Sequence, residues 1–568
     1  MLASSERNSL VQGVTPNTIT VHTNERHDVS ASLGDQSTKS TNAHKSPTPS
    51  PSTNNVEQRS PGNRPSAEIV ASFDGLGYGF GGPQGVANVR NPSDNSLAVG
   101  PDHIVQIVNT RMAVFTKKGK RYETTGKILY GPVVTNAVFA GFGGPCETRN
   151  NGDAVVRYDQ LAGRWLIVMP LFGRAPKRPD QPREAKSGEP AQASPPGRPN
   201  QPGAPFQLVT PATPNPTNPN RAGAATVGDG PYSMCYAVSR TSDPLGEYYR
   251  YEFLRAYFPD YPRPAVWPDG YYVPTSTSDN LIQKHACVVD RNQMLRGLPA
   301  TEQCFIIDGV NFLNNADIDG FGVPPRGAPN IMMAAGGAQL NKILGDDVIL
   351  AWKFHVDWKK PANTKLDGPQ RISVSPYQYL CGGQLTNCVP QPGTETRLDA
   401  QGDKIMARLV YRKVNGHESV VAVHSVAASS GGGGVRWYEF RLDKTRSPTV
   451  YQQGTYAPDN FYRWMASPAI DKKGNIGIGY SFGGSPNYPG QRFAGRLVND
   501  PLGELTTQEN VLIEGEGSQS VMRWEDYTQT AMDPSDDCTI WYVGDYLKKG
   551  AQFYSSRIGA FRFPGCGK

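Results

Sequence analysis

Short apolar segments separated by turns recur along the chain, and none continues with the periodicity of a long helix. Residues 97–105 form one such unit: an apolar strand, a turn with Gly and Asp, and a second apolar strand. The same order of features returns at 264–273, 468–476 and 530–541. Paired apolar segments around a tight turn are typical of β-hairpins. We therefore expect an all-β chain built from a repeated hairpin unit.

The residues that lead into these hairpins also repeat. Asp-Tyr stands at 260–261 and at 526–527, at the same offset before a strand alanine, and Arg-Trp at 463–464 is echoed at 523–524. Composition agrees with an all-β chain, because the 61 glycines and 49 prolines interrupt helices and mark turns, while the 26 tyrosines suit pleated surfaces. A long β repeat with a fixed lead-in favours propeller blades over a stacked sandwich.

Counting units of four strands predicts a seven-bladed β-propeller. The units lie at about 97–130, 153–253, 263–308, 329–375, 397–451, 463–513 and 524–563. The last unit supplies only three strands before the chain ends, so its outer strand must come from elsewhere. The apolar segment 68–73 is the best candidate. We expect this N-terminal strand to close the last blade and to cover its exposed edge.

Two segments have the composition of unfolded chain. Residues 1–66 contain no Phe, Trp, Tyr or Cys and are dominated by Ser, Thr, Asn and Pro, so they predict a disordered tail. The Pro-rich tract at about 173–230 interrupts a blade and is expected to be an inserted loop. The domain organisation is thus a tail at 1–66 and a propeller at 67–568.

Eight cysteines, scattered singly and without a CxxC pair, favour disulfides over a zinc site. Antiparallel strand pairing predicts a bond between Cys538 and Cys566, and the short Gly-containing loop between Cys381 and Cys388 predicts a second bond. We also expect Cys146–Cys235 and Cys287–Cys304. Disulfides point to a secreted or periplasmic protein, although the first five residues do not have the pattern of a signal peptide. Free buried cysteines are the alternative interpretation.

Charge and hydropathy exclude several classes of partner. A formal charge of +6 on 568 residues is weak, and no basic stretch with interleaved aromatics suggests a nucleic-acid groove. No apolar run reaches the roughly 20 residues that span a bilayer. We therefore expect a monomer that acts without nucleic acid and without a membrane span.

In a propeller, the residues just before the inner strands lie at the mouth of the central channel, where ligand sites gather. The candidates for catalysis are Asp260, His424, Arg463, Arg523 and Asp526. The candidates for binding are Asp94, Asp153, Arg436, Trp464, Trp524 and Tyr527. Asp317 and Asp319 offer carboxylate oxygens of the kind that calcium prefers, so calcium is the candidate cofactor.

Each candidate also has a purely structural interpretation. An Asp before a strand commonly caps its own turn, and Arg beside Trp can be a stacked packing pair. His424 lies in an apolar strand, where a hydrogen-bonded core histidine is commoner than a catalytic base. Two carboxylates alone do not complete a calcium site, so the segment around Asp317 also fits a turn.

Three stretches, at 95–106, 157–165 and 435–439, resemble a family of large secreted bacterial proteins that mostly have no assigned activity. The resemblance covers about residues 68–566, and it implies a propeller and export but no reaction. More broadly the blades are similar to those of sialidase-type propellers, and 535–541 resembles a shortened Asp-box. The arginine triad of sialidases is not evident, which argues against sialidase activity.

Two functions fit these features. The first is recognition of an extracellular or cell-surface glycan or protein through the channel face, with Trp464, Trp524 and Tyr527 as exposed aromatics. The alternative is a polysaccharide lyase or glycoside hydrolase at the channel mouth. A lyase would use His424 or Tyr527 as base and an arginine against a uronate. A hydrolase would use two carboxylates, and Asp260 and Asp526 are expected to lie on nearly opposite blades.

Overall fold

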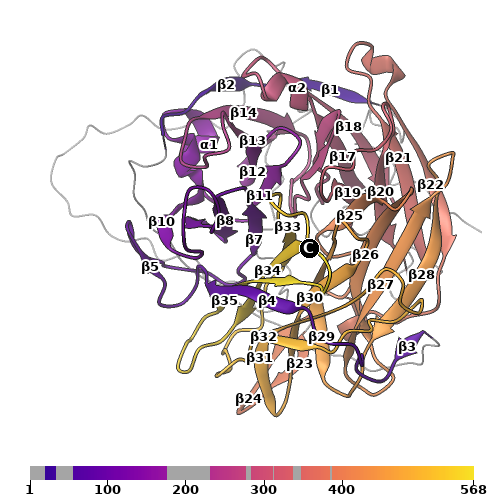
Figure 1. The fold of residues 1–568 in the computed structure, drawn as a ribbon. Coiled ribbons are helices and arrows are strands. Elements are labelled where there is room, and N and C mark those ends of the chain that lie inside the picture. The colour runs from indigo at the N-terminus through magenta and orange to yellow at the C-terminus, as the bar shows by residue number, and fades with distance from the viewer. Residues whose placement is uncertain are drawn as a thin grey trace, which may run out of the picture.

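The computed structural model describes residues 19–32, 56–174, 231–276, 283–310, 312–336, 347–383 and 387–567. Antiparallel sheets stand around a common centre, as in a β-propeller (Figure 1). The helical elements are short. They are α1 (Gly144–Thr148), α2 (Arg291–Met294) and the 3-10 turns η2 (Thr135–Phe139), η4 (Pro361–Asn363) and η5 (Leu380–Gly383). The prediction of an all-β propeller is therefore confirmed at the level of fold class.

Four sheets are separate blades. Two of them have four strands: β7 (Ser96–Val99), β8 (His103–Val108), β9 (Arg111–Thr116) and β10 (Ile128–Val134); and β33 (Gln529–Met532), β34 (Thr539–Tyr546), β35 (Ser555–Arg562) and β4 (Glu68–Asp74). Two have five: β11 (Val155–Asp159), β12 (Arg164–Arg174), β13 (Tyr232–Ser239), β14 (Tyr248–Arg255) and β2 (Arg26–Val29); and β15 (Ala265–Trp267), β16 (Gly270–Tyr272), β17 (Gln283–Val289), β18 (Thr301–Asp308) and β1 (Thr20–Thr23).

The remaining blades are joined into one sheet of thirteen strands. Its strands are β19 (Asn314–Ile318), β20 (Asn330–Ala335), β21 (Val348–His355), β22 (Lys365–Ser373), β25 (Leu409–Val414), β26 (His417–Ala427), β27 (Gly433–Leu442), β28 (Pro448–Tyr456), β29 (Tyr462–Ile470), β30 (Ile476–Gly484), β31 (Asn487–Arg496), β32 (Asn510–Ile513) and β3 (Glu57–Gln58). Parallel pairing of β19 with β25 and of β27 with β29 makes the joins. The structure thus has four separate blades rather than the seven predicted, because sequence patterns do not reveal pairing between neighbouring units.

Two small hairpins complete the strands of the described residues. They are β5 (Gly81–Gly82) with β6 (Gly85–Val86), and β23 (Asn387–Gln391) with β24 (Thr394–Asp399). The innermost strands contact one another in a closed series, β7, β11, β15, β19, β25, β29, β33 and again β7. This series surrounds the channel on which the candidate site depends.

The N-terminal region supplies outer strands to several blades. β4 pairs antiparallel with β35, so the prediction that an N-terminal strand closes the last blade is confirmed. β1 and β2 pair with β18 and β14, and lie along the rim in Figure 1. These strands lie within the segment 1–66 that composition predicts to be disordered. Backbone pairing to an exposed edge needs little apolar burial, which explains why composition does not reveal them. Residues 1–18 and 33–55 lie outside the described residues.

All eight cysteines are paired as predicted, in Cys146–Cys235, Cys287–Cys304, Cys381–Cys388 and Cys538–Cys566. The predicted insert at 173–230 falls almost wholly outside the described residues, and the strands that flank it, β12 and β13, pair with each other. No helix of the described residues is long and apolar enough to cross a membrane.

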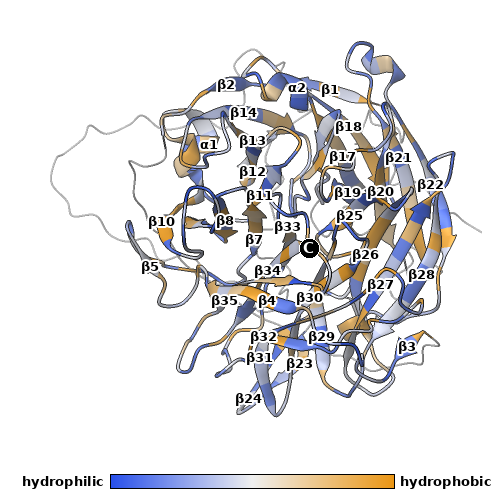
Figure 2. Ribbon diagram, in the orientation of Figure 1, coloured by the Kyte–Doolittle hydropathy of each residue, from blue (hydrophilic) through white to orange (hydrophobic). Residues whose placement is uncertain are grey.

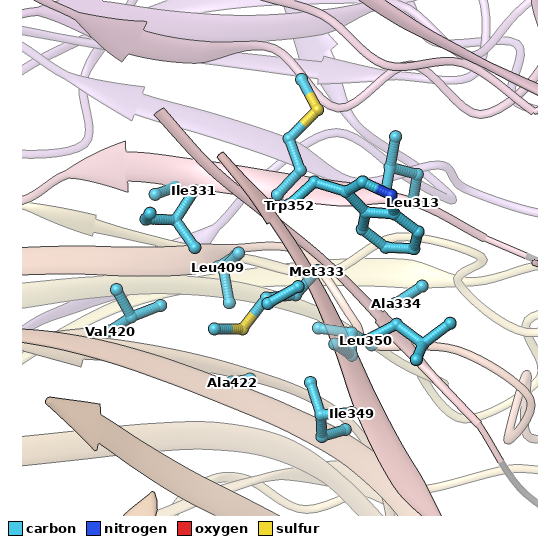
Figure 3. Packing of buried hydrophobic residues seen from close by; sticks show 14 of the residues in the cluster. Leu313, Ile331, Met333, Ala334, Ile349, Leu350, Trp352, Leu409, Val420 and Ala422 are labelled. Atoms are coloured by element: carbon cyan, nitrogen blue, oxygen red, sulfur yellow. The ribbon is translucent and has the colours of Figure 1, made fainter. Parts of the chain in front are cut away.

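The hydrophobic core lies between neighbouring sheets and between the antiparallel runs of the thirteen-stranded sheet. Hydrophobic residues gather on the strands around the ring, whereas hydrophilic residues alternate with them along outer strands such as β22 and β28 (Figure 2). Figure 3 shows one contact of this kind, in which β20 and β21 face β25 and β26. Its labelled members include Ile331, Met333, Ile349, Leu350, Trp352, Leu409, Val420 and Ala422. Each large side chain buried in this way contributes about 1.5–3 kcal/mol, which holds adjacent blades rigidly around the channel.

Candidate functional site at the channel mouth

The residues before four innermost strands converge at one end of the channel. Asp94 precedes β7, Asp153 precedes β11, Asp260 precedes β15 and Asp526 precedes β33. The backbone is left-handed at three of them, with φ of 50° at Asp94, 54° at Asp153 and 65° at Asp526. Non-glycine residues rarely adopt this conformation, and Asp is among those that tolerate it best. We call these four residues, with Asp399 and Arg523, the mouth cluster.

Two carboxyl groups of the mouth cluster share a hydrogen bond. The side chains of Asp153 and Asp260 interact directly, and the hydroxyl of Tyr527 donates to Oδ2 of Asp153 at 2.9 Å. Burial, together with the charges of Asp260 and Asp526, raises the pKa of Asp153 well above its usual range. Burial also raises the pKa of Asp260, against the lowering effect of the hydrogen bond from Asp153. The pair therefore holds one proton, mainly on Asp153.

A third carboxylate lies beside this pair and is ion-paired. Nη2 of Arg523 donates to Oδ2 of Asp526, and Nε2 of Gln401 donates to Oδ1 of Asp526 at 2.8 Å. Nε of Arg523 lies 3.3 Å from Oδ2 of Asp399. Burial raises the pKa of Asp399 to about 7, although the charge of Arg523 acts in the opposite direction. Asp526 keeps partial exposure, so the ion pair faces the opening.

Asp94 is the most deeply buried carboxyl of the four that precede strands. Its exposed fraction is 2%, and neither carboxylate oxygen makes a hydrogen bond of ordinary geometry within the described part of the chain. The backbone amide of Asp153 still lies near enough to favour the charged form. Burial, followed by the charges of Asp153 and Asp526, raises the pKa of Asp94 well above its usual range. A negative charge on Asp94 would thus be poorly compensated by the protein.

Aromatic rings and cations form the wall next to the mouth cluster. The rings of Tyr261 and Tyr527 lie 4.1 Å apart between centroids, and the guanidinium of Arg263 stands 3.9 Å from the centroid of Tyr261. Nζ of Lys404 lies 3.9 Å from the centroid of Phe312. The hydroxyl of Tyr261 donates to the backbone carbonyl of Asp526. This contact brings Asp260 and Asp526 nearer to each other than opposite positions on a wide ring would imply.

His424 and Arg436 lie elsewhere, in a buried aromatic group. Nε2 of His424 is 2.9 Å from the hydroxyl of Tyr438, and its ring centroid lies 4.6 Å from that of Tyr377. Burial and the charge of Arg436 lower the pKa of His424 well below its usual range. Arg436 donates to the backbone carbonyl of Ser375 at 3.0 Å. The structure therefore favours the structural interpretation of both residues.

Arg463, Trp464 and Trp524 are also interior side chains. Arg463 bonds to Asp459 and Glu509, with Nε to Oε1 of Glu509 at 2.7 Å. Trp464 and Trp524 are 0% and 1% exposed. Their assignment as exposed aromatics is wrong, because Arg463 and Trp464 lie inside β29 instead of before it and Trp524 packs against Trp464. Tyr527 is 3% exposed; its ring packs against Tyr261, and its hydroxyl donates to Asp153.

Asp317 and Asp319 form buried ion pairs deeper in the channel, and we call them, with Arg157 and Arg408, the channel group. Nε of Arg408 lies 2.6 Å from Asp317, and its Nη2 lies 2.6 Å from Asp319. Backbone amides of Val266 and Ile470 bond to the remaining oxygens. All four carboxylate oxygens therefore have protein partners, which does not favour the predicted calcium site. Neither arginine could be paired with these aspartates from sequence.

Among the described residues, one group has the spacing of a metal site: Cys287, Glu302 and Cys304. The two cysteines form a disulfide, and Glu302 accepts from Nη2 of Arg255 at 2.6 Å, so this group is structural. A cavity of about 40 Å³ lies beside the channel group. A larger one of about 350 Å³ lies at the far end of β15, next to Trp267 and Asp269.

The sequence patterns missed several members of the mouth. Tyr261 could have been found, because it follows Asp260 as Tyr527 follows Asp526. Asp399 ends β24, and Gln401 and Lys404 lie in the loop between β24 and β25. This region lacks the repeated lead-in, so nothing in the sequence pointed to these residues. The residues brought together as predicted are Asp94, Asp153, Asp260, Arg523, Asp526 and Tyr527. Their roles stay predictions.

Comparison with known proteins gives little beyond this geometry. No family model matches the sequence, and no curated protein matches it. Solved structures that match include a protein of unknown function from Dyadobacter fermentans DSM 18053, at 9% identity and a TM-score of 0.31, covering 88% of this chain and 100% of that one.

Two further matching structures are a polysaccharide lyase and a glycoside hydrolase. An ulvan lyase of polysaccharide lyase family PL25, bound to a GlcA–Rha3S unit, has 9% identity, a TM-score of 0.36 and coverage of 86% of this chain and 95% of that chain. A thermostable family-43 glycoside hydrolase has 8% identity, a TM-score of 0.23 and coverage of 59% and 86%. At these TM-scores the likeness carries no argument about family or activity.

Proposed function

We propose that the mouth cluster binds a glycan and hydrolyses a glycosidic bond. The observation that supports this most is the hydrogen bond between the carboxyl groups of Asp153 and Asp260, beside the ion-paired carboxylate of Asp526. Glycoside hydrolysis needs one carboxyl that stays protonated and a second that stays ionised. Neighbouring carboxyl groups whose environments give them different pKa values can divide these two roles between them.

The roles follow from the surroundings of each group. Asp153 is the general acid that donates its proton to the leaving oxygen, and Asp260 accepts the hydrogen bond that holds the Asp153 carboxyl in place. Asp526, ionised against Arg523, activates water or attacks the anomeric carbon. Water supplies the hydroxyl and the proton that complete the reaction. Product stereochemistry, followed by NMR, distinguishes direct attack by Asp526 from attack by water.

The lyase alternative is less well supported. It requires a free base and a cation for the uronate carboxylate, but His424 is buried against tyrosines, and Arg523 is already bonded to Asp399 and Asp526. Arg463 is bonded to Asp459 and Glu509. Anionic polysaccharides would also face a concentration of carboxylates at the opening, which opposes their approach.

The test is a screen of the full chain against neutral, amino and acidic polysaccharides, following new reducing ends and absorbance from unsaturated uronates. We expect new reducing ends that are lost in Asp153→Asn and Asp526→Asn. Asp443→Asn, an exposed carboxylate in the turn between β27 and β28, is the matched control and should stay active. Unsaturated products would instead favour the lyase. Binding without any product would overturn hydrolysis and favour a recognition module for a glycan or surface protein.

Two further features of the whole molecule belong to this proposal. The thirteen-stranded sheet contains three antiparallel runs of four strands, so we count seven blades in all, joined at two places by parallel pairing. Four disulfides are typical of an oxidising compartment, which supports a secreted or periplasmic location. A monomer remains the expectation, and sedimentation at several concentrations would test it.

A further inference from the structure

The mouth holds more carboxylates than cations. Among the described residues that form it there are six carboxyl groups: Asp94, Asp153, Asp260, Asp399, Asp403 and Asp526. There are three cations: Arg263, Lys404 and Arg523. Six carboxyl groups against three cations leave more acidic groups than the cations of the mouth can pair, so some of them hold protons, as the raised pKa values of Asp94 and Asp153 indicate. A cation that replaced such a proton would interact strongly with the carboxylate, because the local dielectric is far below that of water.

The cations already have protein partners. Arg523 lies between Asp399 and Asp526. Lys404 donates to Oε1 of Gln401 and lies 3.5 Å from Asp403. Arg263 stacks on Tyr261 at 3.9 Å and donates to the carbonyl of Ile405 at 3.4 Å. A sugar carboxylate or sulfate would have to displace an existing partner in order to reach Arg523 or Lys404. Nε and Nη2 of Arg263 make no hydrogen bond within the described residues, but this side chain is buried, with an exposed fraction of 3%.

Asp94 is the second, independent observation. It is almost completely buried, and both its carboxylate oxygens lack a hydrogen bond of ordinary geometry within the described residues. The charges that act on it come from Asp153 and Asp526, of the same sign, and from Arg523. A buried carboxyl in this position costs free energy unless a proton or another cation compensates it. A cationic ligand above Asp153 and Asp526 would supply that compensation.

We propose that the mouth is selective for glycans that carry a free amino group, with the ammonium of a hexosamine placed at the partly exposed Asp153 and Asp526 and above the buried Asp94. This inference rests on the proposed function only in placing a glycan at the mouth. An ammonium offers three donors and a unit positive charge, which matches a site rich in acceptors and short of cations. An N-acetylated sugar has lost that charge, and a uronate reverses it.

The test measures binding of three tetrasaccharides to the full chain by calorimetry near pH 6: glucosamine, N-acetylglucosamine and galacturonate tetramers. We expect the glucosamine tetramer to bind at least about tenfold more tightly than the N-acetylated one, and the galacturonate tetramer not to bind. Because an ammonium stabilises ionised carboxylates, binding should release protons, and the observed heat should depend on the ionisation heat of the buffer. Added salt should weaken the binding of the amino glycan.

The variant Asp94→Asn removes the buried charge while keeping its shape, so it should reduce the preference for the amino glycan, with Asp443→Asn again as control. The salt dependence of the unaltered protein needs no variant and keeps the test independent of folding. Equal or tighter binding of the N-acetylated tetramer, an unchanged preference in Asp94→Asn, or binding of none of the three overturns the inference. Hydrolysis of neutral glycans without a preference for amino sugars would overturn this inference and support the proposed function. Selective binding of the amino glycan without any product would support this inference and overturn the proposed hydrolysis.

Discussion

Two groups of aspartates occupy the channel, and they differ in what surrounds their charge. In the channel group, Arg408 and two backbone amides pair all four oxygens of Asp317 and Asp319. In the mouth cluster, Arg523 forms ion pairs with Asp399 and Asp526, and Asp153 and Asp260 share a hydrogen bond. The carboxyl oxygens of Asp94 make no hydrogen bond of ordinary geometry within the described residues. Burial alone therefore does not mark a functional carboxylate. What distinguishes the mouth cluster is that some of its carboxyl groups have no arginine or backbone amide as a hydrogen-bond partner.

The largest effect should come from breaking the compensation in the channel group. Arg408→Met leaves Asp317 and Asp319 buried without their main cation, and we expect a loss of about 3–5 kcal/mol in the free energy of unfolding. Urea unfolding measures it. Adding Asp317→Asn and Asp319→Asn to the same variant should restore most of the loss. A melting temperature that stays unchanged in Arg408→Met would contradict the comparison.

The converse substitution is Asp153→Asn at the mouth. The amide cannot donate a proton to a leaving group, so hydrolysis should fall by at least about 100-fold in kcat. Stability should change by less than about 1 kcal/mol, because the proton of Asp153 already makes it neutral. Asp317→Asn is the matched variant in the channel group, and it should lose stability while its folded fraction keeps kcat. If both variants lost only stability, the distinction between the two groups would fail.

The third prediction concerns pH and Asp94. A carboxyl whose pKa is raised in the folded state keeps its proton where the unfolded chain has lost it. Stability from this source therefore falls as pH rises from about 4, the unfolded pKa, towards the raised value. Asp94→Asn removes this loss, so the variant should become more stable relative to the parent as pH rises from about 4 to about 8. The gain is about 1.4 kcal/mol for each unit by which the pKa is raised.

Unfolding free energies of parent and Asp94→Asn at the two ends of that pH range provide the measurement. A difference between the two proteins that is independent of pH would show that the Asp94 carboxyl is compensated after all. Asp317→Asn is the comparison variant in the channel group, and it should be destabilising at both ends of the range, because it removes a partner of Arg408.

The smallest effect should come from Tyr527→Phe. The Tyr527 hydroxyl donates to Asp153 and favours its charged form, so its removal raises the pKa of Asp153 further. The basic limb of the kcat/KM profile, which reports loss of the acid's proton, should move upward by on the order of half to one pKa unit. A downward shift would mean that Asp153 does not supply the proton.

Sequence patterns predicted the parts of the molecule that repeat. The hairpin units and the closing strand predicted at 68–73 follow from periodicity, and Cys538–Cys566 follows from strand order. The repeated lead-ins located Asp260 and Asp526, and the position before an inner strand located Asp94 and Asp153. The left-handed backbone at three of these positions explains why Asp recurs there, whatever its further role. A backbone conformation that favours Asp at equivalent positions is thus visible as a repeated residue type in a single sequence.

Patterns failed where the outcome depends on contacts between distant segments. Trp464 and Trp524 were predicted to be exposed aromatics at the mouth. β29 begins earlier than expected, so Trp464 lies inside this strand, and Trp524 packs against it; both are buried. Asp317 and Asp319 were predicted to be metal ligands, but in the structure both bond to Arg408, which lies about ninety residues away in the chain. Asp399, at the end of β24, and Lys404, in the loop that follows, enter the mouth from a region that breaks the repeat. None of these pairings leaves a local trace in the chain.

The closing strand has a consequence for how the protein is made. Asp74 pairs with Arg557, 483 residues later, so β4, which is made early, finds its partner only when synthesis is nearly complete. At about 5–20 residues per second, that interval lasts roughly 25–100 seconds. During it the chain carries an apolar strand with no edge to join. Assembly of the ring is therefore a single late event, and a ribosome that stops early releases a chain that cannot close.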